Sequence, residues 1–225
     1  MNNLERAIAL AVAAHKHNKL DEDGMPHIVH CMEVMLKVKK WCEEHQRSER
    51  IFYPAARALK LYTLEELLIA AILHDAVEDS EGLVTLSLIL SEYGEKVHRL
   101  VDGLTRRGLG EGEEKEFYRD FIYRAKTDPG TLLIKSADLE HNRSRSFHIK
   151  QARWRDKLTF KYSTAMRVLN TDPDDQQVTW EQASTTWING NDGEHFYIAD
   201  PNGKRIELSK TEFEALRATW KKASA

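Results

Sequence analysis

Hydrophobic residues recur every three or four positions through most of the chain up to Leu169, which is the spacing of one face of an α-helix. Thr63 and Glu66 form a capping-box pattern in front of the most apolar of these segments. That segment is apolar on nearly all sides before His74, so we expect it at the centre of a helical bundle. The pattern predicts helices at residues 4–19, 28–41, 64–79, 83–93, 95–104 and 117–127, and another that begins at residues 131–142. Residues 43–62 are predicted as a loop whose helical content the pattern does not fix, and residues 128–130 as a turn.

The pattern changes after Leu169. Residues 170–177 are polar and contain a proline, so we interpret them as a linker. Short segments rich in β-branched and aromatic residues follow, and they predict strands at 178–180, 185–188, 194–200 and 204–209. The sequence DPNG between the last two predicts a hairpin turn, and a second capping-box pattern, from Ser209 to Glu212, precedes a final helix. The fold class is therefore mainly α, with a helical domain at 1–169 and a small strand-plus-helix module at 170–225.

Composition excludes several classes of protein. The formal net charge of -3 argues against generic nucleic-acid binding, which requires a basic excess. No stretch approaches the roughly 20 apolar residues that span a bilayer, so we expect neither a membrane segment nor a signal peptide. Cys31 and Cys42 are the only cysteines, and two do not make a disulfide framework. We therefore expect reduced thiols in a cytoplasmic protein.

Titratable residues gather at the end of the most apolar predicted helix. His74 and Asp75 are followed by Glu78 and Asp79, and such groups are costly to bury unless they are paired or bound to metal. Helical spacing places Glu78 one turn after His74, and Asp79 one turn after Asp75. A His-Asp dipeptide taken alone is more typical of a helix end that becomes solvated.

Two further residues change that balance. His30 lies on an otherwise apolar helical face, and Asp138 follows the strongly apolar segment TLLIKSA. Each is individually more typical of a core histidine or an ion-paired carboxylate. Together with His74 and Asp75 they offer imidazole and carboxylate ligands, which suit a divalent transition metal such as Mn²⁺, with zinc or iron as alternatives.

These residues carry a resemblance to a known family. An early histidine, an HD dipeptide and a distant aspartate form the pattern of the HD phosphohydrolase superfamily. The segments AAHKHNKLDEDGMPHIVH, AAILHDAVEDS, VHRLVDGLT and LLIKSADLEHN resemble, in the same order, the hydrolase domain of RelA/SpoT homologues. The resemblance covers about residues 4–146, and its most specific element is HD-x-x-ED. Without a synthetase-like region afterwards, the chain resembles the small alarmone hydrolase branch.

The resemblance implies an HD-domain helical bundle that removes the 3′-pyrophosphate of (p)ppGpp-like nucleotides and releases pyrophosphate. It implies that Glu78 and Asp79 are the catalytic acidic pair. The implied metal ligands are His30, His74, Asp75 and Asp138. The implied substrate-binding residues are Lys19, Asn142, Arg119, Lys135, Arg143 and Arg145.

The chain also departs from the family pattern around the substrate. Leu20 follows Lys19 where a second basic residue is expected, and Leu139 follows Asp138 where a basic residue is usual. His27 stands in place of a tyrosine, and Cys31 in place of a proline. These changes spare the metal ligands, and they leave the choice between guanine and adenine open.

Two other functions stay open at this point. The chain could be an HD-type nucleotidase or phosphodiesterase that acts on other nucleotides, including ppApp-like ones. It could also be a non-catalytic HD module that binds a ligand. The sequence around the HD dipeptide favours the alarmone hydrolase, and the intact ligand set counts against a non-catalytic module. The C-terminal module leaves open a homodimer or a protein partner.

Overall fold

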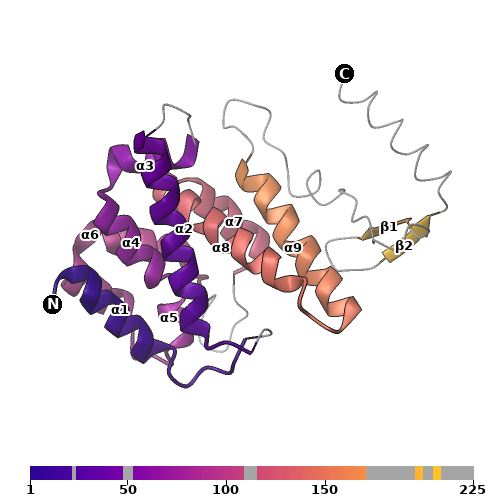
Figure 1. The fold of residues 1–225 in the computed structure, drawn as a ribbon, viewed down its shortest axis with the longest axis horizontal. Helices are drawn as coiled ribbons and strands as arrows, with labels where there is room; N and C mark the ends of the chain where they lie inside the picture. The colour runs from indigo at the N-terminus through magenta and orange to yellow at the C-terminus, as the bar shows by residue number, and fades with distance from the viewer. Residues whose placement is uncertain (22–23, 48–52, 109–115, 171–195, 200–204, 209–225) are drawn as a thin grey trace. The chain divides into compact units, whose positions relative to one another are not determined.

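The structure is a computed structural model, and it describes residues 1–21, 24–47, 53–108, 116–170, 196–199 and 205–208 (Figure 1). The chain divides into two compact units, Met1–His148 and Ile149–Ala225. Within the described residues the first unit contains α1 (Asn3–Ala14), α2 (His27–Arg47), α3 (Tyr53–Leu61), α4 (Leu64–Ile72), α5 (Ala76–Asp79), α6 (Leu86–Leu104), α7 (Tyr118–Lys126) and α8 (Pro129–Ser146). The mainly helical fold that the sequence predicted is thus confirmed.

The helix α4 lies at the centre of the first unit. All its residues from Leu67 to Ile72 are buried. It packs against α1, α2 and α6, while α2 also lies along α3 and α8 (Figure 1). The predicted capping box begins this helix, because Thr63 Oγ1 accepts the Glu66 N–H at 3.2 Å and Thr63 N–H donates to Glu66 Oε2 at 2.7 Å. The continuous hydrophobic surface of α4 therefore sets the position of the residues that follow it.

The predicted helix over residues 64–79 is not continuous. It ends at Ile72, a turn holds residues 73–75, and the short helix α5 follows. In this turn the Ala76 N–H donates to the Leu73 carbonyl at 3.0 Å, one residue closer than in an α-helix. Successive residues of a regular helix do not face each other. The turn allows His74 and Asp75 to do so, with Nε2 and Oδ2 3.1 Å apart.

Two more predictions require correction. The segment at residues 43–62, predicted as a loop of open helical content, is largely helical where the structure describes it: α2 continues to Arg47, and α3 follows with buried Ala55 and Ala58. The predicted turn at residues 128–130 is the start of α8. Asp128 caps this helix by accepting the N–H groups of Gly130 and Thr131 at 2.8 and 3.2 Å. Proline in the first helical turn needs no N–H partner, so the sequence that suggested a turn begins a helix instead.

Gly94 interrupts α6 as its position between two predicted helices suggested. Its φ of 82° lies in the left-handed region that favours glycine, and it divides α6 into two helical parts. The second part ends at Leu104, next to Arg106, whose backbone reaches the candidate site.

In the part of the second unit that the structure describes lie α9 (Ala152–Asn170) and two short strands, β1 (Phe196–Ala199) and β2 (Arg205–Leu208). The strands pair antiparallel, with Phe196 opposite Leu208 and Ala199 opposite Arg205. The predicted strands at 178–180 and 185–188, the hairpin turn and the final helix lie outside the described residues. The strand-plus-helix module and its boundary after residue 169 stay predictions. Among the described residues, no helix is long and apolar enough to cross a membrane.

Candidate metal centre and active site

Three separate segments bring the four predicted metal ligands together: α2 carries His30, the turn after α4 carries His74 and Asp75, and α8 carries Asp138. The Nε2 atoms of His30 and His74 are 3.2 Å apart. Asp138 Oδ1 lies 3.2 Å from His30 Nε2 and 3.7 Å from His74 Nε2. Asp75 Oδ2 lies 3.7 Å from His30 Nε2. His30, His74 and Asp138 are buried, so this is a closed group of potential ligands.

The surroundings of the His74 ring suit a metal ligand. His74 Nδ1 lies 2.8 Å from the Ala71 carbonyl, which can only accept, so Nδ1 carries a proton and Nε2 is the nitrogen that a metal ion could bind. Burial by itself would lower the pKa of His74, but the charges of Asp75 and Asp138 and their hydrogen bonds raise it to about 10. The carboxylates of Asp75 and Asp138 thus favour positive charge at Nε2, and a divalent ion can supply it in place of a proton.

Asp138 is held by its neighbours on α8. Lys135 Nζ donates to Asp138 Oδ2 at 2.6 Å, and the Asn142 amide donates to Oδ1. Burial would raise the pKa of Asp138, but Lys135 and the hydrogen bonds from His30 and His74 hold it well below its ordinary value. The structure thus places Lys135 and Asn142, two predicted substrate contacts, on a predicted metal ligand. Their roles toward a substrate stay predictions.

His141 is a member of the site whose role the sequence did not assign. Its Nδ1 lies 2.7 Å from Nδ1 of His30, on the side of that ring away from His74. Burial and the nearby charges of His30 and Arg145 lower the pKa of His141 to about 4, so a neutral ring can accept the Nδ1 proton of His30. Metal-binding histidines commonly donate their second N–H to such a partner. The position of His141 one helical turn after Asp138 was the available sequence signal.

Replacing His141 by phenylalanine is expected to lower Mn²⁺ affinity by about 10- to 100-fold, the usual effect of removing a hydrogen-bond partner of a metal ligand. The ring volume is nearly kept, while the acceptor for the His30 Nδ1 proton is lost. A chelator-competition titration measures the affinity. His148→Phe is the matched control, because His148 is exposed. Equal affinities for the two variants would contradict this role of His141.

The predicted acidic pair lies beside the ligands on α5. Glu78 Oε1 accepts the backbone N–H of Arg106 at 2.8 Å. Asp79 Oδ2 accepts from the Asn18 amide at 3.3 Å, and its side chain is 37% exposed. Burial and the charge of Asp75 raise the pKa of Asp79. The two carboxylates thus border the metal group with different surroundings, and their catalytic roles stay predictions.

A chain of charged groups connects the site to α8 through His27. His27 Nδ1 lies 3.1 Å from Asp21 Oδ1, and Arg145 forms an ion pair with Asp21 Oδ2 at 2.8 Å. On its other side, His27 Nε2 lies 3.2 Å from Asp75 Oδ2. Burial would lower the pKa of His27, but hydrogen bonds to Asp75 and Asp21 raise it to about 9. The sequence identified His27 and Asp21 only as departures from the family pattern, and the structure makes them neighbours of a ligand.

The remaining predicted substrate residues lie at exposed positions. Lys19 is in the segment after α1, and Arg143 is on α8. Arg119 is on α7, where it pairs with Asp120 at 3.1 Å. The described contacts therefore connect Lys135, Asn142 and Arg145 to the metal group. The assignment of Lys19, Arg119 and Arg143 to a substrate stays a prediction.

No family model matches the chain, but comparison with known proteins finds similar sequences. Over 137 residues, 60% of this chain, it is 31% identical to a guanosine-3′,5′-bis(diphosphate) 3′-pyrophosphohydrolase of Aquifex aeolicus. Over 78 residues, 33% of this chain, it is 44% identical to a probable GTP pyrophosphokinase of Mycobacterium leprae. The matches take in only 16% and 10% of these two relatives, so the chain spans a small part of their length.

A solved structure supports the same relationship at the level of the fold. It is described as a metazoan orthologue of SpoT that hydrolyses ppGpp and plays a role in starvation responses. The match has a TM-score of 0.55 and 20% sequence identity, and it covers 76% of this chain and 89% of the other. The chain is thus similar in sequence to part of proteins named as guanosine-3′,5′-bis(diphosphate) 3′-pyrophosphohydrolase and GTP pyrophosphokinase, and similar in fold to this orthologue of SpoT.

Proposed function

We propose that this chain is a metal-dependent hydrolase that removes the 3′-pyrophosphate of (p)ppGpp-like nucleotides. The observation that carries the proposal is the convergence of His30, His74, Asp75 and Asp138 from three segments far apart in the sequence. The similarity to a protein named for this reaction supports it.

We propose one Mn²⁺ ion as the cofactor, with zinc or iron as alternatives. Mixed imidazole and carboxylate ligands suit such ions better than they suit Mg²⁺, which prefers oxygen ligands and keeps its waters. His30, His74, Asp75 and Asp138 would hold the ion. When bound, a divalent ion of this kind lowers the pKa of a coordinated water and polarises a phosphate oxygen.

The side chains around this group would complete the reaction. Glu78 or Asp79 would orient the attacking water and accept its proton. The water oxygen forms a bond to the phosphorus next to the ribose, and the bond from that phosphorus to the 3′ oxygen breaks. Pyrophosphate leaves, the 3′ oxygen takes a proton from solvent to become a hydroxyl, and a nucleoside 5′-diphosphate or 5′-triphosphate remains. We propose that Lys19, Arg119, Asn142 and the Arg143/Arg145 pair contact the nucleotide, with Lys135 acting through Asp138.

The second candidate is an HD-type nucleotidase or phosphodiesterase with another nucleotide substrate. Two residues near the metal ligands support this second candidate. Arg145 is engaged with Asp21, and Leu139 is fully buried rather than basic and exposed. Fewer cations are therefore available for a nucleotide with two diphosphates than the family pattern implies.

A substrate panel separates the two candidates. With Mn²⁺ present, ppGpp and ppApp are expected to release pyrophosphate, while GDP and ADP, which lack the 3′-pyrophosphate, are expected to stay intact. Because Leu20 and Leu139 replace basic residues, we expect only a modest preference for guanine over adenine. Pyrophosphate and phosphate release are measured separately. Equal or faster cleavage of simple nucleotides would favour the nucleotidase.

We also propose that residues 170–225 form a small strand-plus-helix module, distinct from the hydrolase domain at 1–169, that mediates a homodimer or binds a protein partner. The antiparallel pairing of β1 with β2 supports the strand part of this proposal.

A further inference from the structure

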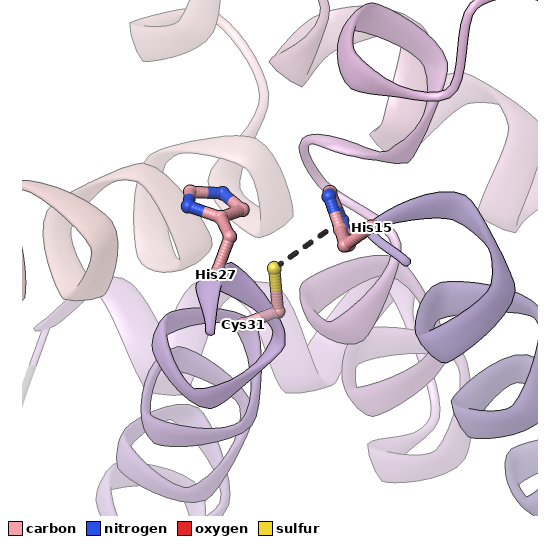
Figure 2. Close-up of side chains that lie close together, drawn as sticks. All are labelled: His15, His27 and Cys31. Carbon is pink, nitrogen blue, oxygen red and sulfur yellow. Dashed lines mark hydrogen bonds between the residues drawn. The ribbon is translucent and has the colours of Figure 1, made fainter. Parts of the chain in front are cut away.

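A second group of potential metal ligands lies beside the first. It consists of His15, at the end of α1, and His27 and Cys31, one turn apart at the start of α2. Figure 2 shows the two imidazole rings on either side of the Cys31 side chain. One ligand atom from each residue lies within 4.8 Å of the others, and Cys31 Sγ is 3.6 Å from His15 Nε2. The proposed reaction uses none of these three side chains.

The spacing of the group fits a tetrahedral thiolate and imidazole site. With a zinc–sulfur distance of about 2.3 Å and a zinc–nitrogen distance of about 2.0–2.1 Å, sulfur and nitrogen ligands stand about 3.6 Å apart. This is the separation observed between Cys31 Sγ and His15 Nε2. Cys31 is fully buried and His15 is 5% exposed, so the ligands are shielded from competing water.

Each histidine has a partner for its second nitrogen. His27 Nδ1 faces the Asp21 carboxylate, which Arg145 holds from its other side, so the ring is oriented as in a carboxylate–histidine–metal arrangement. His15 Nδ1 lies 3.1 Å from Asn18 Nδ2, which also donates to Asp79 Oδ2 at 3.3 Å. His15 Nε2 therefore faces Cys31 Sγ, while His27 Nε2 faces Asp75, the carboxylate nearest to both groups.

We propose that His15, His27 and Cys31 form a second metal site for a thiophilic divalent ion, with Zn²⁺ as the best fit, and that Asp75 is shared with the first site. Asp75 Oδ2 lies 3.2 Å from His27 Nε2 and 3.1 Å from His74 Nε2, so one carboxylate stands between the two groups. Sulfur favours zinc in the second site, whereas the first site offers two imidazoles and two carboxylates and no sulfur. On binding, the Cys31 thiol loses its proton to solvent and the thiolate becomes the ligand.

Cobalt substitution tests the second site without any nucleotide. The full-length protein is stripped with a chelator and titrated with Co²⁺, while bound metal and the ultraviolet and visible spectrum are recorded. We expect two equivalents per chain and a thiolate-to-cobalt charge-transfer band. Cys31→Ser is expected to lose the band and one equivalent. Cys42→Ser, at the other buried cysteine of α2, is the matched control and should keep both.

Cys31 is buried, so Cys31→Ser could disturb the fold. Two further variants test the site without changing this residue. His27→Gln, at a side chain that is 18% exposed, should bind one equivalent with unchanged helix content by circular dichroism. His74→Ala should lose one equivalent but keep the charge-transfer band. One equivalent in the unmodified protein would overturn the proposal. If that single equivalent carried a band that Cys31→Ser removed, Cys31 would belong to the first group, where it also lies near His74 and Asp75. Because no nucleotide is used, failure to cleave ppGpp leaves this outcome unaffected.

Discussion

Asp138→Asn is expected to lose the metal held by His30, His74 and Asp75 and, with it, hydrolysis, so that turnover falls to the background of the metal-free protein. Asp138 Oδ1 faces the Nε2 atoms of both His30 and His74, so the substitution removes a negative charge from the centre of the proposed site. It also leaves the buried Lys135 ammonium opposite a neutral amide, and this uncompensated charge would repel a divalent ion. Metal content by mass spectrometry and pyrophosphate release from ppGpp are the two measurements.

The matched control is Asp128→Asn, the same substitution at the N-cap of the same helix. Asparagine caps helices about as well as aspartate, so this variant should keep its fold, metal and turnover. Because loss of the Lys135 pair also costs stability, thermal denaturation of Asp138→Asn must show a folded protein at the assay temperature. His74→Ala provides a second test with the same expected loss. Full turnover by either variant without metal would rule out the proposed role of the site.

Glu78→Gln and Asp79→Asn are each expected to keep the metal and lower turnover by roughly 10²-fold or more, the usual effect of losing a general base. The amide keeps the shape of each side chain but removes its basicity. Glu78 contacts the Arg106 backbone, and Asp79 contacts Asn18, so neither substitution removes one of the four converging ligands.

Glu81→Gln is the control for this pair, because Glu81 is an exposed carboxylate just after α5. Its turnover should match that of the unmodified protein. The assignment of roles would be wrong if Glu78→Gln or Asp79→Asn lost metal while activity per bound metal stayed the same. The metal content of each preparation is therefore measured alongside the rate.

The sequence alone was sufficient for much of the helical framework. The spacing of apolar residues predicted most of the helices in the first unit, and the Thr63–Glu66 pair predicted the start of α4. Gly94 was correctly placed between two helical segments. These features depend on residues a few positions apart, so a local pattern is enough to reveal them. The resemblance to RelA/SpoT homologues also pointed to the four residues that the structure brings together.

Only the tertiary structure decided how those residues meet. No helical pattern distinguishes a continuous helix from α4 and α5 with a turn between them, because neither proline nor glycine marks the turn at residues 73–75. Likewise, His30 and His141 are 111 positions apart, and the sequence offers no sign that their Nδ1 atoms lie 2.7 Å from each other. The grouping of His15, His27 and Cys31 arises in the same way, from the approach of α1 to α2. Hydrophobic burial, which is non-directional, selects the helices that pack, and the polar contacts between distant segments are determined only once that packing is in place.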